Sequence, residues 1–246
     1  MATPTTKRPL PPPEPVPPLE PGDHLSRDEF ERRYDAMPDL KGAELIDGVV
    51  YMPSPVGFAK HAAPHFNLVT WLGVYCASTP GVRGGDNSTI RLDIDTEPQP
   101  DATLIIEPSC GGRVALSADD FIVGSPEWVG EVSASSASFD LHTKFRVYRR
   151  VNVQEYLVWR VRDQAIDWFV LQNDDYDKLA LSSAGLYKST VFPGLWLEPA
   201  ALIRGAMSRV LQVVQEGIAT GEHADFVKRL QECAARNAGS ARHAAK

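Results

Sequence analysis

The sequence lacks the features that mark secreted and membrane-spanning proteins. Its three cysteines lie far apart and form no CxxC pair, so neither a disulfide framework nor a zinc cluster is expected. No apolar run is long enough to cross a bilayer. The N-terminus also lacks the apolar region of a signal peptide. We therefore predict a cytoplasmic protein that has no membrane partner.

Positive charge is also scarce. The chain has 25 Lys and Arg residues against 32 Asp and Glu residues, which gives a formal net charge of −7. Such a chain does not coat nucleic acid through bulk positive charge. An enzyme that contacts a few phosphates through a bound metal remains compatible with this composition, because the metal brings charge of its own.

Proline is concentrated at one end of the chain. Nine of the twenty prolines fall within residues 1–22, where they favour an extended conformation over helix or sheet. We predict a disordered tail over residues 1–22, with a docking arm for an unknown protein partner as the alternative. One domain over residues 23–203 should follow, and then a helical C-terminal extension over residues 204–246 with a disordered end.

The remaining pattern predicts a layered α/β fold. Ser26 and Glu29 form a capping box that should begin a short helix. Further helices are expected at residues 60–75, 139–150 and 199–236. Strands are expected at residues 43–53 (a hairpin around Asp47-Gly48), 89–94, 102–106, 128–132, 155–159, 165–171 and 179–181. These elements suggest one mixed central sheet flanked by helices.

Three acidic residues stand where strands normally carry apolar side chains. Asp101 opens one apolar strand, Glu131 lies inside another, and Glu44 precedes an apolar pair. Because a buried carboxylate without a partner costs free energy, each should form an ion pair or bind a metal. Clusters of carboxylate oxygens suit Mg²⁺ or Mn²⁺. For Glu44, a structural ion pair with Arg91 or Arg146 is the alternative.

A lysine follows on the next predicted helix. Lys144 has Asp140 and Tyr148 one turn away on the same helical face. A lysine near a metal-bound phosphate would orient the attacking water or stabilise the developing charge. The alternative is an ordinary solvated surface lysine.

Several short motifs, taken in their order along the chain, resemble one known family. They are Glu44-Leu45-Ile46-Asp47-Gly48, Gln99-Pro100-Asp101, Glu131-Val132-Ser133, Lys144 with Tyr148, and Glu155-Tyr156. The set resembles the Uma-type putative restriction endonuclease family of the PD-(D/E)XK nuclease superfamily. Each motif is short, but the ordered set is specific and spans residues 25–202.

The resemblance implies a restriction-endonuclease-like mixed sheet and a metal-dependent endonuclease that hydrolyses DNA phosphodiester bonds with Mg²⁺ or Mn²⁺. Asp101, Glu131 and the backbone carbonyl of Val132 would hold the metal. Glu44 and Lys144 would complete the catalytic set. The resemblance also makes a homodimer plausible, and His61 matches a histidine that is common in the family.

One departure from the family pattern supports a different function. The pattern normally places a lysine two residues after the glutamate, where this chain has Ser133. Together with the acidic charge, this favours the alternative of a catalytically silent nuclease-fold protein with a binding or regulatory role. A metal-dependent hydrolase of another phosphoester is a third hypothesis. Salt-sensitive DNA binding would separate the first hypothesis from the others.

Overall fold

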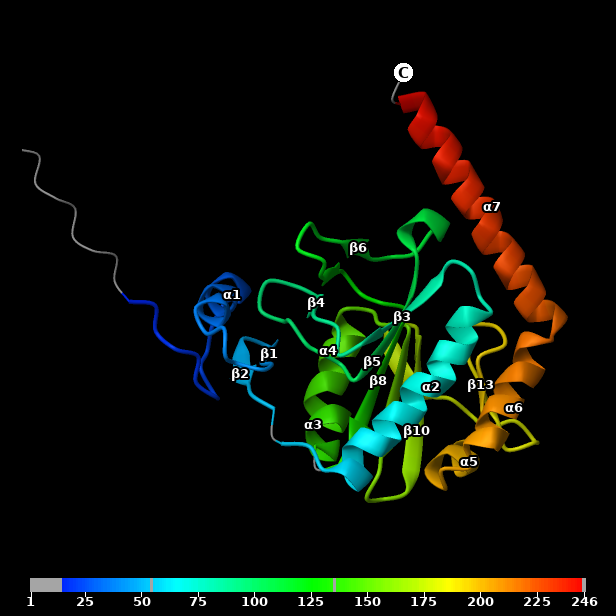
Figure 1. The fold of residues 1–246 in the computed structure, drawn as a ribbon, viewed down its shortest axis with the longest axis horizontal. Helices are drawn as coiled ribbons and strands as arrows, with labels where there is room; N and C mark the ends of the chain where they lie inside the picture. Colours follow the sequence, from blue (N-terminus) through cyan, green and yellow to red (C-terminus); the bar gives the residue numbers. More distant parts are fainter. Residues whose placement is uncertain (1–14, 54, 135, 245–246) are drawn as a thin grey trace, which may run out of the picture.

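The computed structural model describes residues 15–53, 55–134 and 136–244 (Figure 1). Residues 1–14, which make up most of the Pro-rich tail, and residues 245–246 lie outside the described residues, so the predicted docking arm stays a prediction. The end of the tail contacts the protein body. Leu19 is buried, and its backbone N–H donates to the sulfur of Met37. The Gly22 N–H donates to the Val50 carbonyl at 2.9 Å.

A six-stranded mixed sheet forms the centre of the fold and confirms the predicted architecture. Its strand order is β11-β10-β9-β8-β5-β3. The strands are β3 (Val82–Asp86), β5 (Ala102–Ile106), β8 (Trp128–Ser133), β9 (Glu155–Arg160), β10 (Ala165–Gln172) and β11 (Asp175–Lys178). Strands β8 and β9 are parallel, whereas the other pairs in this sheet are antiparallel. A parallel pair needs a long crossover connection, and a helix supplies it.

The crossover helix covers one face of the sheet. It consists of α3 (Ala137–Phe139), the π-helical segment η3 (Asp140–Lys144) and α4 (Phe145–Arg150). Val147 and Tyr148 pack against Val129 and Tyr156 of the sheet in one buried cluster. The helix ends at Arg150, and two residues later Asn152 has a φ of 61°, in the left-handed region that asparagine tolerates better than most residues. The next strand can therefore begin shortly afterwards.

The opposite face is covered by helices from distant parts of the sequence (Figure 1). They are η1 (Phe58–Ala62), α2 (Ala63–Ala77), α5 (Pro199–Ile203) and α6 (Met207–Ile218). Helix α7 (Gly221–Ala244) lies beside α6, contributes Phe226 and Leu230 to the buried cluster on this face, and runs on beyond the sheet. Trp71 of α2 meets Trp128 and Trp168 of the sheet edge-to-face, with ring centroids 6.0–6.3 Å apart. Val210 and Val214 of α6 join the same cluster. In the described part of the chain, no helix is long and apolar enough to cross a membrane.

Smaller elements surround the sheet. They are α1 (Arg27–Asp35), η2 (Pro108–Cys110), the hairpins β1–β2 (Glu44–Ile46, Val49–Tyr51) and β12–β13 (Tyr187–Lys188, Trp196–Leu197), and a sheet of β4 (Ile90–Arg91), β7 (Ile122–Val123) and β6 (Ala115–Leu116). Ser26 caps α1 as predicted, by accepting from the Glu29 N–H at 3.4 Å. Asp47 and Gly48 have positive φ values of 50° and 76°, as the predicted hairpin turn requires.

Two predicted strands differ from the structure. The strand expected at residues 89–94 is limited to β4, and the side chain of Ile94 is 81% exposed instead of buried. A turn after β4 causes this, because the Thr96 carbonyl accepts from the Leu92 N–H at 3.1 Å. The strand expected at residues 179–181 lies at β11 instead. Asn173 and Asp174 have φ values of 50° and 65° and reverse the chain directly after β10.

The helical C-terminal part was predicted as one stretch over residues 199–236, but the structure divides it into three helices. Gly205 has a φ of 69° and ends α5. Helix α6 ends at Ile218, and α7 begins at Gly221. The breaks let α6 turn back onto the sheet and bury its apolar side chains there.

Candidate functional site

The predicted site lies where β5 begins beside β8. Asp101 directly precedes β5, and Glu131 lies within β8. The antiparallel register pairs Ala102 with Gly130 and so places Asp101 opposite Glu131. The Val132 N–H donates to Oδ2 of Asp101 at 2.6 Å and fixes that carboxylate. Two acidic residues that are 30 positions apart in the sequence are thus brought to one place.

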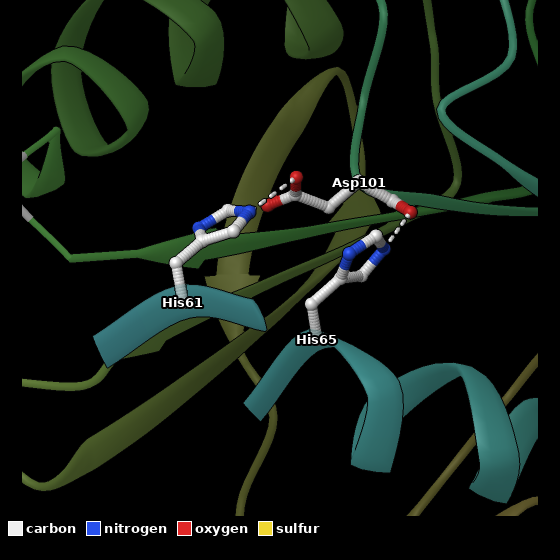
Figure 2. A group of neighbouring side chains, drawn as sticks. All are labelled: His61, His65 and Asp101. Carbon is white, nitrogen blue, oxygen red and sulfur yellow. Dashed lines mark hydrogen bonds and ion pairs between the residues drawn. The ribbon is translucent and has the colours of Figure 1, made fainter. Parts of the chain in front are cut away.

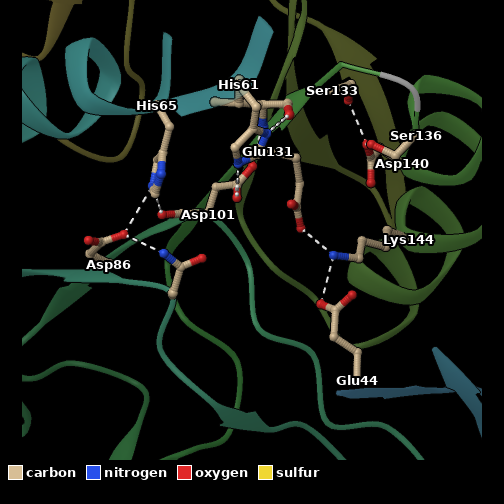
Figure 3. A network of polar contacts seen from close by, with 12 residues as sticks. Glu44, His61, His65, Asp86, Asp101, Glu131, Ser133, Ser136, Asp140 and Lys144 are labelled. Atoms are coloured by element: carbon tan, nitrogen blue, oxygen red, sulfur yellow. Dashed lines mark hydrogen bonds and ion pairs between the residues drawn. The ribbon is translucent and has the colours of Figure 1, made fainter. Parts of the chain in front are cut away.

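A buried lysine joins two of the predicted site residues (Figure 3). Nζ of Lys144 donates to Oε1 of Glu131 at 2.9 Å and to Oε1 of Glu44 at 2.8 Å. The Tyr148 hydroxyl also donates to Oε1 of Glu131, at 3.1 Å. The Gln99 N–H donates to Oε1 of Glu44 at 2.7 Å. We call Glu44, Glu131, Lys144 and Tyr148 the lysine cluster.

Burial and mutual attraction set the charge states in the lysine cluster. The side chains of Lys144 and Glu131 are 5% and 6% exposed. Burial acts to lower the pKa of Lys144, but attraction by Glu131 and Glu44 raises it well above its ordinary value. Burial raises the pKa of Glu131, and the Lys144 ammonium opposes that rise. Lys144 is therefore a buried ammonium and not the solvated surface residue that the alternative expected.

The alternative partners considered for Glu44 are wrong. Arg91 pairs with Glu31 at 2.7 Å, and Arg146 donates to a backbone carbonyl of its own helix. Glu44 pairs with Lys144 instead. The hairpin β1–β2 brings Glu44 to the crossover helix, so the partner comes from a segment 100 residues away in the sequence.

Two histidines, His61 of η1 and His65 of α2, lie next to Asp101 (Figure 2). Nε2 of His61 lies 3.3 Å from Oδ1 of Asp101, and Nδ1 of His61 lies 2.9 Å from the Val132 carbonyl. Nε2 of His65 lies 2.7 Å from the Asp101 carbonyl and 3.0 Å from Oδ1 of Asp86. We call His61, His65 and Asp101 the histidine cluster; a set of their ligand atoms lies within 4.8 Å of one another.

The electrostatics of the histidine cluster favour an ion pair. The hydrogen bond to Asp101 raises the pKa of His61, although burial of the ring opposes this. Burial acts to raise the pKa of Asp101, but the hydrogen bonds from His61 and the Val132 N–H outweigh it and lower the pKa. The two side chains remain 18% and 13% exposed. The pair is therefore reachable from solvent.

The structure adds residues that the sequence analysis did not select. His65 lies one helical turn after His61, and this spacing was a usable signal because such residues share a helix face. Asp86 carried no usable signal, because its strand holds two glycines and was not predicted. The Val132 carbonyl, expected to hold a metal, accepts from His61 when Nδ1 carries the hydrogen.

Each cluster takes one residue from a π-helical turn. His61 lies in η1, and Lys144 ends η3. Such turns widen the helix locally, and they recur at functional sites. The second turn is anchored by Asp140, whose Oδ2 accepts from the hydroxyls of Ser133 at 2.5 Å and Ser136 at 2.7 Å. Ser133 stands where the family pattern has a lysine, and its hydrogen bond to Asp140 anchors the crossover helix that carries Lys144.

Comparisons with known proteins identify the family and the fold. The sequence profile of a family described as Uma2, putative restriction endonuclease, matches residues 27–200. No curated protein matches the chain. A crystal structure described as a putative nuclease belonging to DUF820 from Anabaena variabilis ATCC 29413 is similar, with a TM-score of 0.52 and 16% identity. The match covers 73% of this chain and 99% of that chain. The family and fold expected from the motifs are confirmed.

Proposed function

Because this chain belongs to the Uma2 family of putative restriction endonucleases, we propose that it is a metal-dependent nuclease that hydrolyses DNA phosphodiester bonds. One observation carries the proposal. Asp101 lies opposite Glu131 across two antiparallel strands, and Lys144 reaches Glu131 from the crossover helix. Carboxylates can hold a divalent cation, and a lysine ammonium can stabilise the negative charge that develops during hydrolysis.

The charge balance of the site supports the need for a cation. Three carboxylates, those of Glu44, Asp101 and Glu131, lie around one lysine ammonium and the His61 ring. A DNA phosphate brings a further negative charge. A divalent cation between the carboxylates and the phosphate would remove this repulsion, which is why we propose metal dependence for a protein of net charge −7.

The carboxylates of Asp101 and Glu131, together with the Val132 carbonyl, would hold Mg²⁺ or Mn²⁺. These are oxygen donors, and the hydrogen bonds from Lys144 and Tyr148 both fall on Oε1 of Glu131, which leaves the other carboxylate oxygen to bind a cation. When bound, the cation would polarise the scissile phosphate and activate water.

The lysine would act on the water or on the phosphate. The Lys144 ammonium is held charged inside the protein, so it offers donors in a site of low polarity, where each hydrogen bond is strong. Glu44 also accepts a hydrogen bond from Lys144 and acts as a positioning residue. Lys144 would orient the attacking water towards the phosphate.

The test is cleavage of plasmid and single-stranded DNA by purified protein with Mg²⁺ or Mn²⁺. We expect cleavage by the wild type, and its loss with chelator, in Asp101→Ala and in Lys144→Ala. Lys228→Ala is the matched control, because Lys228 is exposed on α7. Cleavage that persists in Asp101→Ala, or a wild type that does not cleave with either metal, would contradict the proposal.

One observation favours a second function. Within the lysine cluster, Lys144 donates hydrogen bonds to both Glu44 and Glu131. A catalytically silent nuclease-fold protein that binds DNA or a regulatory partner would keep such a cluster for stability. Salt-sensitive DNA binding by the wild type without cleavage under any metal condition would support this function.

A further inference from the structure

We propose that His61, His65 and Asp101 form a metal site with two nitrogen donors, which makes the protein bind Zn²⁺ and Mn²⁺ more tightly than Mg²⁺. The inference deepens the proposed function and rests on it for the use of the metal, but metal binding itself can be tested separately. It changes the expected ligand set, because imidazole nitrogens replace carbonyl oxygen beside the Asp101 carboxylate.

The spacing between His61 and Asp101 fits two ligands of one ion. Nε2 of His61 and Oδ1 of Asp101 are 3.3 Å apart (Figure 2). Bonds of roughly 2.0–2.1 Å to a tetrahedral zinc ion would place two ligand atoms about 3.3 Å apart. The two atoms can therefore bind a metal with little movement of either side chain.

A backbone contact sets the orientation of the His61 ring. Nδ1 of His61 lies 2.9 Å from the carbonyl oxygen of Val132, which can only accept a hydrogen bond. Nδ1 must therefore carry a hydrogen, which leaves Nε2, the nitrogen that faces Asp101, to bind a metal once it has released its proton. Metal-binding histidines are commonly held in this way, with the second nitrogen donating to a carbonyl or carboxylate.

His65 would supply the second nitrogen. Its ring centroid lies 5.6 Å from that of His61, and its Nε2 contacts the Asp101 carbonyl and Oδ1 of Asp86. The Asp86 side chain is 57% exposed, so that contact is solvated and inexpensive to break. The same nitrogen lies 2.7 Å from the Asp101 carbonyl, so binding through it needs the His65 ring to shift away from both oxygens.

The donor set decides which metals are preferred. Imidazole nitrogen suits zinc and the neighbouring transition metals, whereas Mg²⁺ prefers oxygen donors and gives up its water reluctantly. The side chains of His61, His65 and Asp101 are 18%, 14% and 13% exposed, so an ion can enter from solvent. In the neighbouring lysine cluster, by comparison, the side chains of Lys144 and Glu131 are only 5% and 6% exposed.

The experiment is calorimetric titration of the full-length, untagged, chelator-treated protein with Zn²⁺, Mn²⁺ or Mg²⁺. We expect affinity in that order, and we expect His61→Ala or His65→Ala to weaken Zn²⁺ binding by at least about tenfold. His142→Ala is the matched control, because it removes an exposed imidazole from the crossover helix. Thermal melting checks that each variant is folded.

Two results would overturn the inference. One is Mg²⁺ binding as tight as Zn²⁺ binding in the wild type, which needs no variant to fold. The other is Zn²⁺ affinity that falls as much in His142→Ala as in His61→Ala. DNA cleavage is measured in parallel. Histidine-dependent Zn²⁺ binding without cleavage would refute the proposed nuclease alone, whereas Mg²⁺-driven cleavage with unchanged Zn²⁺ affinity in His61→Ala would refute this inference alone.

Discussion

The lysine cluster and the histidine cluster lie side by side but satisfy their charges differently (Figure 3). Lys144 is 5% exposed and gives hydrogen bonds to two carboxylates of the protein. His61 and Asp101 are 18% and 13% exposed and form a single contact at 3.3 Å. Two neighbouring residues of β8 belong to different clusters. The side chain of Glu131 contacts Lys144, whereas the backbone of Val132 contacts Asp101 and His61.

This difference in exposure suggests that the two clusters contribute differently to folding stability and to metal binding. A buried ion pair whose partner is removed leaves an uncompensated charge, which is costly in a medium of low polarity. A partly exposed pair can be rehydrated when a partner is lost, so its removal costs less. We therefore expect the lysine cluster to dominate folding stability and the histidine cluster to dominate metal binding.

The largest expected effect comes from removing the buried ammonium. Lys144→Met should lower the free energy of unfolding by about 3–5 kcal/mol, because Glu131 and Glu44 would lose their shared counter-charge. Urea denaturation measures this. Lys228→Met, at an exposed position of α7, is the control and should change stability by less than about 0.5 kcal/mol.

A second variant sharpens this prediction. Adding Glu131→Gln to Lys144→Met removes the uncompensated charge and should restore part of the lost stability. Strictly additive losses in the double variant would show that the two side chains do not act as a pair, and the contrast between the clusters would then fail.

The next largest effect is expected at Glu97, a buried carboxylate that has no lysine partner, and it concerns the pH dependence of folding stability. Burial and the neighbouring Glu31 raise the pKa of Glu97 from 4.5 to about 8, while Arg91 opposes the rise. The folded state thus keeps a proton that the unfolded chain has released, so its stability contribution is full below pH 4.5 and declines as the pH rises to about 8. Glu97→Gln should abolish this decline, which has an upper limit of about 1.4 kcal/mol per pH unit.

Melting temperatures of the wild type and Glu97→Gln between pH 5 and 8.5 check this prediction. The melting temperature of Glu97→Gln should rise relative to that of the wild type as the pH increases. Glu222→Gln, an exposed substitution on α7, is the control and should follow the wild type at every pH. A constant difference between Glu97→Gln and the wild type would mean that Glu97 does not titrate in this range.

A smaller effect is expected in the histidine cluster. Asp101→Asn keeps an oxygen that can accept from the Val132 N–H but loses the charge that pairs with His61. The free energy of unfolding should fall by only about 1 kcal/mol. The Zn²⁺ affinity should fall by at least about tenfold. Urea denaturation and calorimetry on the same sample measure both. A stability loss as large as that of Lys144→Met would contradict the contrast.

The smallest effect is expected at the edge of the histidine cluster. Asp86→Asn removes a charge that is 57% exposed and contacts His65. Stability should change by less than about 0.5 kcal/mol. Zn²⁺ binding should be retained, because Asp86 is not among the proposed ligands. Loss of Zn²⁺ binding in this variant would place Asp86 in the site instead of beside it.

Much of the fold was predictable because its signals are local. The strands that contain or follow Glu131 and Asp101 were identified by short apolar runs, and the turn at Asp47-Gly48 by residues that tolerate positive φ. Strand β3 was missed because its Gly84-Gly85 pair has no strand preference of its own. Pairing with β5 makes it a strand, and that pairing depends on the folded sheet.

The sequence by itself indicated candidate residues: acidic residues at or within apolar strands, a lysine on the helix after Glu131, and His61 at the start of an earlier helix. Only the tertiary structure decided their partners. Lys144 meets Glu44 across 100 residues, and His61 meets Val132 across 71. The physical reason is that local patterns fix the periodicity of an element, whereas contacts between distant segments depend on how the helices pack on the sheet.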